Sequence, residues 1–481
     1  MKTATKLPLI LFFGLLFFSL VPTTYAQPYT INSEFSNTTE YDYVTEGIYI
    51  VWWDNEWDYE ADALELLTYM QPYRDYCLDI LDMQDPPNPT DGFFYNVYLH
   101  HGEDDFPSWW GNGQGTDSNG YPYLTLPIGA HNDWVNVAHE TFHVFQYSAT
   151  SQGFAYSGDS QWYIEASANW FAAIQNEGVA GAFLEAESLV RLPHVALWLS
   201  YDNFPNNYPE NWQRYVHQYA LALFLYYMSE HTDVPDELIT NGMYAGTNDL
   251  PQEYFFNQLG AEVFRNHFLD WAARMTNHFD FLPTNQIERF ELEWNDYADP
   301  EDDNEFIATY ANEGTNGWVR PADENITTGW SYNTYKINVT EADNYLFEIK
   351  GDEEGSAGSD SFFQGKVLVQ DVDGNAQFYD VPMLNEQEGS FFLEVSENDT
   401  AIYLIVASVP ETFTDVEQTY GYEVNITKGA VLGVPENDMR TTPPKVIARY
   451  DLLGRKVLEN YVGIQIVKFD DGSVKKIYNP R

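Results

Sequence analysis

The sequence predicts an α+β protein that ends in β-rich segments. Short apolar runs typical of strands come first, and segments with apolar residues at helical spacing follow them to about residue 295. After Trp318 the pattern changes to short strands separated by polar turns. We therefore expect a small mixed β-sheet with a helical lobe, then a β-sandwich and a small C-terminal β-domain.

The first segment after the N-terminal region contains the strands of the sheet. Its predicted elements are strands over residues 47–53, 93–99 and 121–128 and a helix over residues 59–81. Pro122 and Pro127 favour an edge position for the third strand, because proline has no N–H to donate to a neighbour. Residues 27–45 are polar, and we expect them to form no regular structure.

The next segment is mainly helical. Asn132 or Asp133 can cap the helix that follows them, because a short polar side chain can accept hydrogen bonds from the first free N–H groups. Further helices are predicted over residues 161–175, 211–229, 252–259, 261–276 and 286–296. The sandwich strands are predicted over residues 335–339, 344–349, 366–369, 391–395, 401–407 and 422–426.

Composition limits the class of protein. With 44% hydrophobic and 17% aromatic residues the chain can bury a large core. Its single cysteine, Cys77, allows no intrachain disulfide and falls in a helical pattern, which favours a core residue over a nucleophile. The net charge of −52 excludes nucleic acid as a partner, because phosphates would be repelled. The acids are scattered, which is typical of a highly solvated exterior.

The N-terminus has the pattern of a secretory signal peptide. Lys2 and Lys6 precede an apolar run over residues 7–20, and small residues up to Ala26 suit cleavage after that position. The apolar run is short for a membrane helix, and no other stretch is long and apolar enough to span a bilayer. We expect residues 1–26 to be removed and the protein to be secreted, not integral to a membrane.

The string His139-Glu140-Thr141-Phe142-His143 has the form H-E-x-x-H. On a helix, residues four apart lie on one face, so His139 and His143 can direct two imidazoles at one metal ion. Glu140 lies beside them, where it can accept a proton from a metal-bound water. The motif therefore indicates a zinc hydrolase, and first of all a peptidase.

A catalytic zinc needs a third protein ligand. The metzincin pattern would place Gly and His after the motif, but Gln146 and Ala149 occupy those positions. Glu165 lies 22 residues after His143, beyond a loop that can reverse the chain, in the string E-A-S-A-N. This arrangement resembles the gluzincin, or thermolysin-like, peptidases, in which a downstream helix supplies E-x-x-[AS]-[DN]. Asn169 matches the position that orients a ligating imidazole in that family.

The resemblance implies a mechanism. Zn²⁺ held by His139, His143 and Glu165 would activate a water, and Glu140 would act as general base and then protonate the leaving amine. Should Glu165 not be the ligand, Glu177 is the next residue to test.

The resemblance also implies a donor for the oxyanion. Family members use a Tyr or His on a later helix, and Tyr215, His217 and Tyr219 are the candidates in this chain, with Tyr219 and His217 preferred.

The C-terminal segment is basic, unlike the rest of the chain. Tyr450 to Val457 reads YDLLGRKV, and Gly463 to Ser473 reads GIQIVKFDDGS. These strings resemble the sorting domain of the type IX secretion system of Bacteroidetes, with Gln465 where that family usually has Tyr. The resemblance implies that the type IX machinery is a partner, that the protein crosses the outer membrane and that the tail is removed.

These patterns give a provisional domain order. A metallopeptidase domain would cover residues 27–318, a β-sandwich 319–428, a linker 429–444 and the sorting domain 445–481. The absence of a G-x-M-E-N string favours an endopeptidase that acts on protein or peptide substrates.

Two other classes of function stay open. One is a carbohydrate- or surface-binding protein, which the aromatic content, acidity and predicted sandwich favour. The other is a degenerate peptidase fold used for adhesion, against which the intact residues His139, Glu140 and His143 argue.

Overall fold

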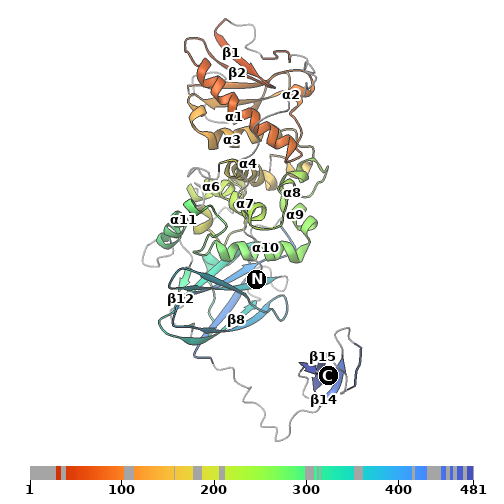
Figure 1. Cartoon of the computed structure of the whole chain (residues 1–481), viewed down its shortest axis with the longest axis vertical. Coiled ribbons are helices and arrows are strands. Elements are labelled where there is room, and N and C mark those ends of the chain that lie inside the picture. The colour runs from red at the N-terminus through yellow and green to blue at the C-terminus, as the bar shows by residue number, and fades with distance from the viewer. Residues whose placement is uncertain are drawn as a thin grey trace, which may run out of the picture. The chain divides into compact units, whose positions relative to one another are not determined.

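The structure is a computed structural model of the whole chain (Figure 1). It describes residues 29–33, 39–101, 113–156, 158–176, 187–204, 212–297, 308–310, 314–315, 317–351, 361–413, 418–430, 446–450, 455–458, 463–469 and 474–479. The contacts divide the chain into two units, 1–429 and 430–481. The predicted signal peptide, Glu177 and most of the predicted linker lie outside the described residues.

A five-stranded sheet forms the first layer of the larger unit. Its strands are β1 (Tyr41–Glu46), β2 (Tyr49–Asp54), β3 (Tyr95–His100), β4 (Gly113–Thr116) and β5 (Pro122–Pro127), in the order β1-β2-β3-β5-β4. The three central strands are parallel, and β1 and β4 are antiparallel edges. Alternate residues face opposite ways, so Tyr49 and Val51 join the main core while Ile50 and Trp52 form a second cluster on the other face.

Two expectations about this sheet are wrong. The strand at 121–128 is not an edge, because β4 pairs with its outer side. Pro122 and Pro127 are the end residues of β5, where a missing N–H costs little pairing. Residues 41–45 lie in the segment expected to be irregular but form most of β1, which pairs with the apolar β2.

Helices cover the sheet and build the next layers. They are α1 (Glu60–Asp79), α2 (Pro87–Thr90), α3 (Trp134–Gln146), α4 (Gln161–Gln175), α5 (Glu187–Arg191), α6 (Trp212–Ala220), α7 (Ala222–His231), α8 (Asp236–Asn241), α9 (Pro251–Leu259), α10 (Ala261–Arg274) and α11 (Thr284–Tyr297). The predicted cap is confirmed, since the Asp133 side chain accepts a hydrogen bond from the backbone N–H of Asn136 at 3.1 Å. The single helix expected at 211–229 is instead α6 and α7, which meet at Leu221.

Two sheets form the β-sandwich of the larger unit. Its strands are β6 (Ala308–Tyr310), β7 (Ser331–Asn338), β8 (Asp343–Gly351), β9 (Phe363–Asp371), β10 (Ala376–Asp380), β11 (Glu388–Val395), β12 (Asp399–Ser408) and β13 (Tyr422–Lys428). One sheet has the order β10-β9-β12-β7-β6 and the other β11-β8-β13. The predicted fold class, a mixed sheet with a helical lobe followed by a sandwich, is confirmed.

The smaller unit is a three-stranded antiparallel sheet. It contains β14 (Val446–Tyr450), β15 (Gly463–Phe469) and β16 (Val474–Asn479) in that order. Arg449 donates a hydrogen bond to the buried Gln465 side chain at 3.1 Å. This matches the small β-module expected from the sequence, and export through the type IX machinery stays a prediction.

One hydrophobic core runs from the first sheet through the helices to the sandwich. It includes Tyr49 of β2 and Tyr403 of β12, and α10 packs on β9 and β12 (Figure 1). The junction centres on Trp330, which stacks on Phe413 with ring centroids 5.0 Å apart and packs 5.1 Å from Phe264. Trp330 has the left-handed φ of 57°, a conformation that costs about 1–3 kcal/mol and that the surrounding contacts must offset.

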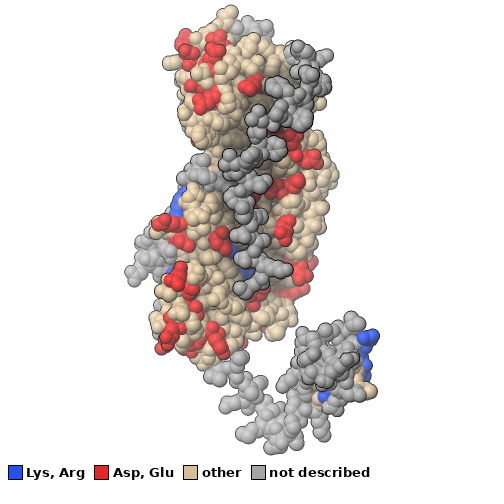
Figure 2. Space-filling view, viewed as in Figure 1, with Lys and Arg blue, Asp and Glu red and all other residues tan. Residues whose placement is uncertain are grey.

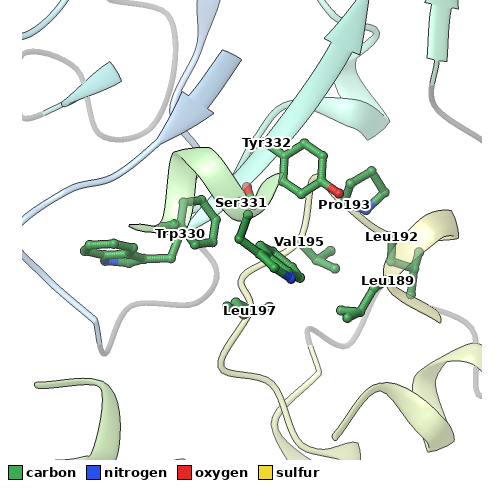
Figure 3. A pocket seen from close by; sticks show the side chains of 10 residues that line it. Leu189, Leu192, Pro193, Val195, Leu197, Trp330, Ser331 and Tyr332 are labelled. Atoms are coloured by element: carbon green, nitrogen blue, oxygen red, sulfur yellow. The ribbon is translucent and has the colours of Figure 1, made fainter. Parts of the chain in front are cut away.

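A small apolar cavity lies beside this junction. Figure 3 shows Leu189 and Leu192 on one side of it, and Trp330 and Tyr332 at the start of β7 on the other. Backbone hydrogen bonds tie the two sides together, from Leu197 to Trp330 at 3.0 Å and from Tyr332 to Pro193 at 2.7 Å. The sandwich is thus attached by both apolar packing and backbone pairing.

Surface charge agrees with the composition. Figure 2 shows acidic side chains scattered over the described part of the viewed face instead of gathered in one patch. None of the helices in the described ranges has the length and apolar character needed to cross a bilayer.

Because the core is continuous, we expect the helical lobe and the sandwich to unfold together. Trp330→Ala should lower the free energy of unfolding by about 3–5 kcal/mol, the usual cost of truncating a large buried aromatic side chain. Denaturant unfolding followed by tryptophan fluorescence and by circular dichroism should give coincident transitions. Trp318→Ala, at a residue that is 44% exposed, is the control and should change stability little. Two separate transitions, with only the sandwich weakened, would contradict the shared core.

Candidate metal centre

The packing of α3 against α4 creates the site. Both helices are buried along most of their length, and Phe142 of α3 stacks on Phe171 of α4 with centroids 4.9 Å apart. Phe142 also meets Trp170 edge-to-face at 6.2 Å. These contacts pack α3 directly against α4. His139 lies three residues before Phe142 and His143 one residue after it, so the same packing brings both imidazoles to α4.

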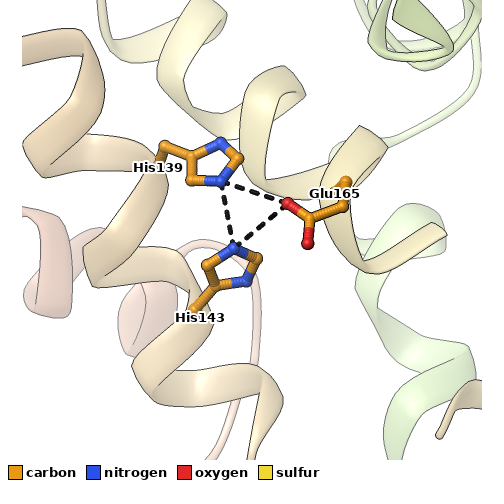
Figure 4. Close-up of side chains that lie close together, drawn as sticks. All are labelled: His139, His143 and Glu165. Carbon is orange, nitrogen blue, oxygen red and sulfur yellow. Dashed lines mark hydrogen bonds and ion pairs between the residues drawn. The ribbon is translucent and has the colours of Figure 1, made fainter. Parts of the chain in front are cut away.

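Three ligand atoms converge between the helices (Figure 4). Nε2 of His139 lies 3.4 Å and Nε2 of His143 lies 3.5 Å from Oε2 of Glu165, and the two Nε2 atoms are 3.0 Å apart. Two atoms bound tetrahedrally to one zinc ion at about 2.0–2.1 Å are roughly 3.3 Å apart, so the spacing suits that ion. All three residues are buried, and the group could hold a metal ion.

Hydrogen bonds to the far ring nitrogens decide which nitrogens are free to bind. Asn169 of α4 donates its amide N–H to the Tyr219 carbonyl at 3.4 Å, so its Oδ1 faces Nδ1 of His139 at 2.7 Å. An amide oxygen only accepts, so Nδ1 of His139 must carry the proton and Nε2 keeps a lone pair. Gln146 places its Oε1 2.5 Å from Nδ1 of His143, with the same consequence. Asn169 thus takes the position expected from the sequence.

The electrostatics of the ligands favour a cation among them. Burial alone would lower the pKa of His143, but the Glu165 carboxylate, Glu140 and the Gln146 hydrogen bond together raise it to about 9. Burial raises the pKa of Glu165, yet hydrogen bonds and charge from His139 and His143 hold it well below its usual range. The carboxylate is therefore ionised at neutral pH. Two lone pairs and a carboxylate at this spacing need either a proton or a metal ion between them.

Glu140 sits next to His139 on α3 and is 6% exposed. Burial raises the pKa of its carboxyl above the ordinary value, the two histidines lower it, and Glu165 raises it. It is not one of the three converging ligands. A buried carboxylate with a raised pKa beside a metal site suits a group that accepts a proton and later returns it.

Tyrosines surround the centre, and the sequence predicted only some of them. Tyr219 stacks on the His139 ring at 6.1 Å, and burial and the Glu165 carboxylate raise its pKa. Tyr156, which the sequence analysis missed, is also near Glu165, and burial of its hydroxyl followed by that carboxylate raises its pKa to about 12. The pKa of Tyr147 is raised first by burial and then by the carboxylates of Glu165 and Glu140. All three phenols are protonated at neutral pH and can donate hydrogen bonds.

The position of Tyr156 could have been noticed in the sequence. It lies in the loop that reverses the chain between α3 and α4, nine residues before Glu165. Polar aromatic residues in such a loop are natural candidates for a site at the helix ends. Its side chain is 58% exposed, which leaves it open to solvent and to a substrate.

The other preferred candidate, His217, points elsewhere. It is fully buried, with Nδ1 3.0 Å from Ser188 Oγ and its ring 5.2 Å from Phe204. Burial lowers its pKa to about 4, so it is neutral at physiological pH. The third candidate, Tyr215, is 47% exposed, and its ring centroid lies 6.0 Å from that of Tyr219. Of the candidates on α6, the structure brings Tyr219 to the ligands and leaves His217 in the core.

One protein-family model matches residues 49–429, and it is described as a family of unknown function, DUF6055. The chain belongs to DUF6055. The match covers strands β2 to β5 of the first sheet, the helices and the sandwich of this DUF6055 member and ends where the smaller unit begins. No curated protein matches the DUF6055 chain.

Several solved structures are similar to parts of this DUF6055 chain. The pre-peptidase C-terminal domain of a Bacillus anthracis collagenase is 12% identical, with a TM-score of 0.18, over 27% of this chain and 98% of that domain. A xylan-binding domain is 16% identical, with a TM-score of 0.16, over 24% and 71%. The M60 catalytic domain with two CBM51 domains from Clostridium perfringens ZmpB is 9% identical, with a TM-score of 0.25, over 91% and 67%. Similarities this low assign no function.

Removing one imidazole should remove the metal. In His143→Ala we expect zinc content to fall from one ion per chain to a trace, because two remaining ligands do not hold zinc stoichiometrically. Elemental analysis of protein purified without chelator measures this. The control is His267→Ala on α10, a histidine outside the ligand group, which should keep its zinc. Full zinc in His143→Ala would show that the metal lies elsewhere.

Proposed function

We propose that this protein is a zinc-dependent peptidase, and that it cleaves protein or peptide substrates internally. The convergence of His139, His143 and Glu165 on one point carries the proposal. The H-E-x-x-H string supports it, since this motif pairs two metal ligands with a general base.

The proposed metal supplies one part of the chemistry. When bound by these three residues, Zn²⁺ lowers the pKa of a water molecule and polarises a carbonyl group. The set of two imidazoles and one carboxylate is that of a catalytic zinc site, which keeps a position for water, whereas structural sites use four protein ligands.

Glu140 is the proposed general base. Its carboxylate accepts the proton of the attacking water and then delivers it to the amine that leaves when the peptide bond breaks. Burial favours this exchange, because it raises the pKa of Glu140 towards the working pH while the neighbouring histidines keep it from rising further.

The attacked carbonyl oxygen becomes negatively charged and needs hydrogen-bond donors. Tyr219 stacks on the His139 ring, and burial followed by the Glu165 carboxylate raises the pKa of both Tyr156 and Tyr219, so both hold a proton at neutral pH. Tyr156 is the more exposed of the two, so its hydroxyl is more accessible to a substrate. We therefore assign the oxyanion contact first to Tyr156, with Tyr219 as the alternative.

A substrate also needs a surface along which its backbone can lie. β4 is one of the two edge strands of the first sheet, and it packs against the motif helix α3. An extended peptide can add to such an edge by main-chain hydrogen bonds, which bind peptides of many sequences.

Two substitutions should affect catalysis and metal binding differently. Glu140→Gln keeps the size of the side chain but cannot take a proton, so it should keep zinc and the melting temperature while peptide hydrolysis falls by about 10²–10⁴-fold. Glu165→Gln removes a charged ligand and should instead weaken zinc binding. The measurements are cleavage of a mixed peptide library, zinc content and thermal unfolding.

The outcomes of this pair distinguish the assignments. Wild-type cleavage by Glu140→Gln would refute the proposed mechanism. Normal zinc in both variants, with only Glu140→Gln inactive, would leave the base in place and require another third ligand, with Glu177 the next to test. A wild-type protein that holds zinc but cleaves no peptide would favour a binding role over the peptidase.

A second experiment tests the oxyanion donor. Tyr156→Phe removes one hydroxyl and should lower kcat by about 10²–10³-fold, the usual effect of losing one such donor, with zinc content unchanged. Tyr201→Phe, on a ring next to Tyr215 and further from the ligands, is the control and should leave kcat near the wild-type value. If Tyr219→Phe shows the loss and Tyr156→Phe does not, the role belongs to Tyr219. Unchanged kcat in both would exclude the two phenols.

A further inference from the structure

Gln146 connects the two ligand-bearing helices in a way that its place in the sequence does not suggest. It is the last residue of α3 and lies one turn after His143, on the same face of the helix. It is 5% exposed, and both polar atoms of its amide have partners. Oε1 is 2.5 Å from Nδ1 of His143, and Nε2 reaches Ile164 O at 3.1 Å and Ser167 Oγ at 2.8 Å.

The partners fix the orientation of this amide. The Ile164 carbonyl can only accept, so the NH₂ end of Gln146 must face α4. The Ser167 hydroxyl donates to the Tyr163 carbonyl at 2.6 Å and is thereby free to accept from the same NH₂ group. The oxygen of Gln146 then faces His143, where it accepts the Nδ1 proton. Turning the amide over would place its oxygen against the Ile164 carbonyl oxygen, two acceptors with no proton between them.

Gln146 therefore acts on two ligands through opposite ends of one side chain. Ile164 and Ser167 flank Glu165 on α4, so the two donated hydrogen bonds hold the segment that carries the third ligand. The accepted hydrogen bond fixes the tautomer and the ring orientation of His143. Groups that hydrogen-bond to metal ligands in this way raise metal affinity, because the ligands need not be ordered when the ion binds.

A second amide makes the reverse connection. Asn169 on α4 accepts from His139 on α3, while Gln146 on α3 accepts from His143 and donates to α4. Each helix thus contributes one amide that orients a histidine, and the Gln146 side chain also binds the Ile164 carbonyl and the Ser167 hydroxyl of α4. This double role distinguishes it from Asn169, whose remaining N–H goes to the Tyr219 carbonyl of α6.

We propose that Gln146 is a positioning residue that sets the spacing between His143 and Glu165 before the metal binds. The proposal rests on the proposed metal site, since it concerns the geometry of the same ligands.

The test compares two buried glutamines. Gln146→Met keeps the length of the side chain but removes all three hydrogen bonds, and it should weaken zinc affinity by about 10–100-fold in competition with a chelator. Its Co²⁺-substituted form should show a changed visible spectrum, because that spectrum reports ligand geometry and not overall stability. Gln252→Met is the matched control, since Gln252 is 1% exposed and accepts a hydrogen bond from Trp162 of α4 at 3.2 Å without touching a ligand.

A second variant tests the two ends of the amide individually. It also keeps the proposal testable if Gln146→Met does not fold. Gln146→Glu keeps an oxygen for His143 but loses both donors to α4. It should bind zinc more weakly than the wild type and more tightly than Gln146→Met. Wild-type affinity in Gln146→Glu would show that the contacts to α4 do not contribute, and this would overturn the double role.

The remaining outcomes decide the proposal. Wild-type zinc affinity and Co²⁺ spectrum in Gln146→Met would overturn it, as would equal losses of affinity in Gln146→Met and Gln252→Met, which would mean a general effect of core damage. If the wild type itself binds no zinc, the proposed function fails and this inference fails with it. If the wild type binds zinc and the Gln146 variants bind it with the same affinity, this inference fails while the proposed function stands.

Discussion

The register between α3 and α4 is the constraint on which the whole site depends. His139 and His143 belong to one helix and Glu165 to the next, so their convergence requires that the two helices do not slide. A shift of one helical turn moves a side chain by about 5.4 Å, more than the 3.4–3.5 Å that separates Glu165 from either imidazole. Stacking of Phe142 on Phe171 and the hydrogen bond from the Gln146 amide to the Ile164 carbonyl both link α3 to α4 and oppose that shift.

Burial of the three ligands and the attraction between them have opposite effects on their charge. Burying two imidazoles and a carboxylate disfavours the charged forms, while their mutual attraction favours ionised Glu165 and a cation beside it. Asn169 and Gln146 hold the two imidazoles in place by accepting hydrogen bonds from their Nδ1 atoms. Such preorganisation lets a metal ion bind without the cost of ordering its ligands.

The β-sandwich is packed against the helical lobe that carries the site. Its core-facing aromatic residues meet those of the helical lobe at Trp330 and Trp198, and Trp198 in turn packs 5.0 Å from Trp162 on α4. Damage at the sandwich junction therefore reaches the helix that carries Glu165 through two ring contacts. The DUF6055 match spans both regions without a break, as a shared core would lead one to expect.

The sequence by itself determined what depends on neighbours within a few turns. The four-residue spacing of His139 and His143 and the Asp133 cap are local, and both are present as predicted. Glu165 and Asn169 needed the family pattern in addition. Only the tertiary structure showed β4 as the edge strand, Tyr156 near Glu165 and Gln146 between two helices, because these positions arise from long-range packing. His217 and Tyr219 are two residues apart on α6 and so lie on opposite sides of the helix, and packing decides that the side with Tyr219 faces the ligands.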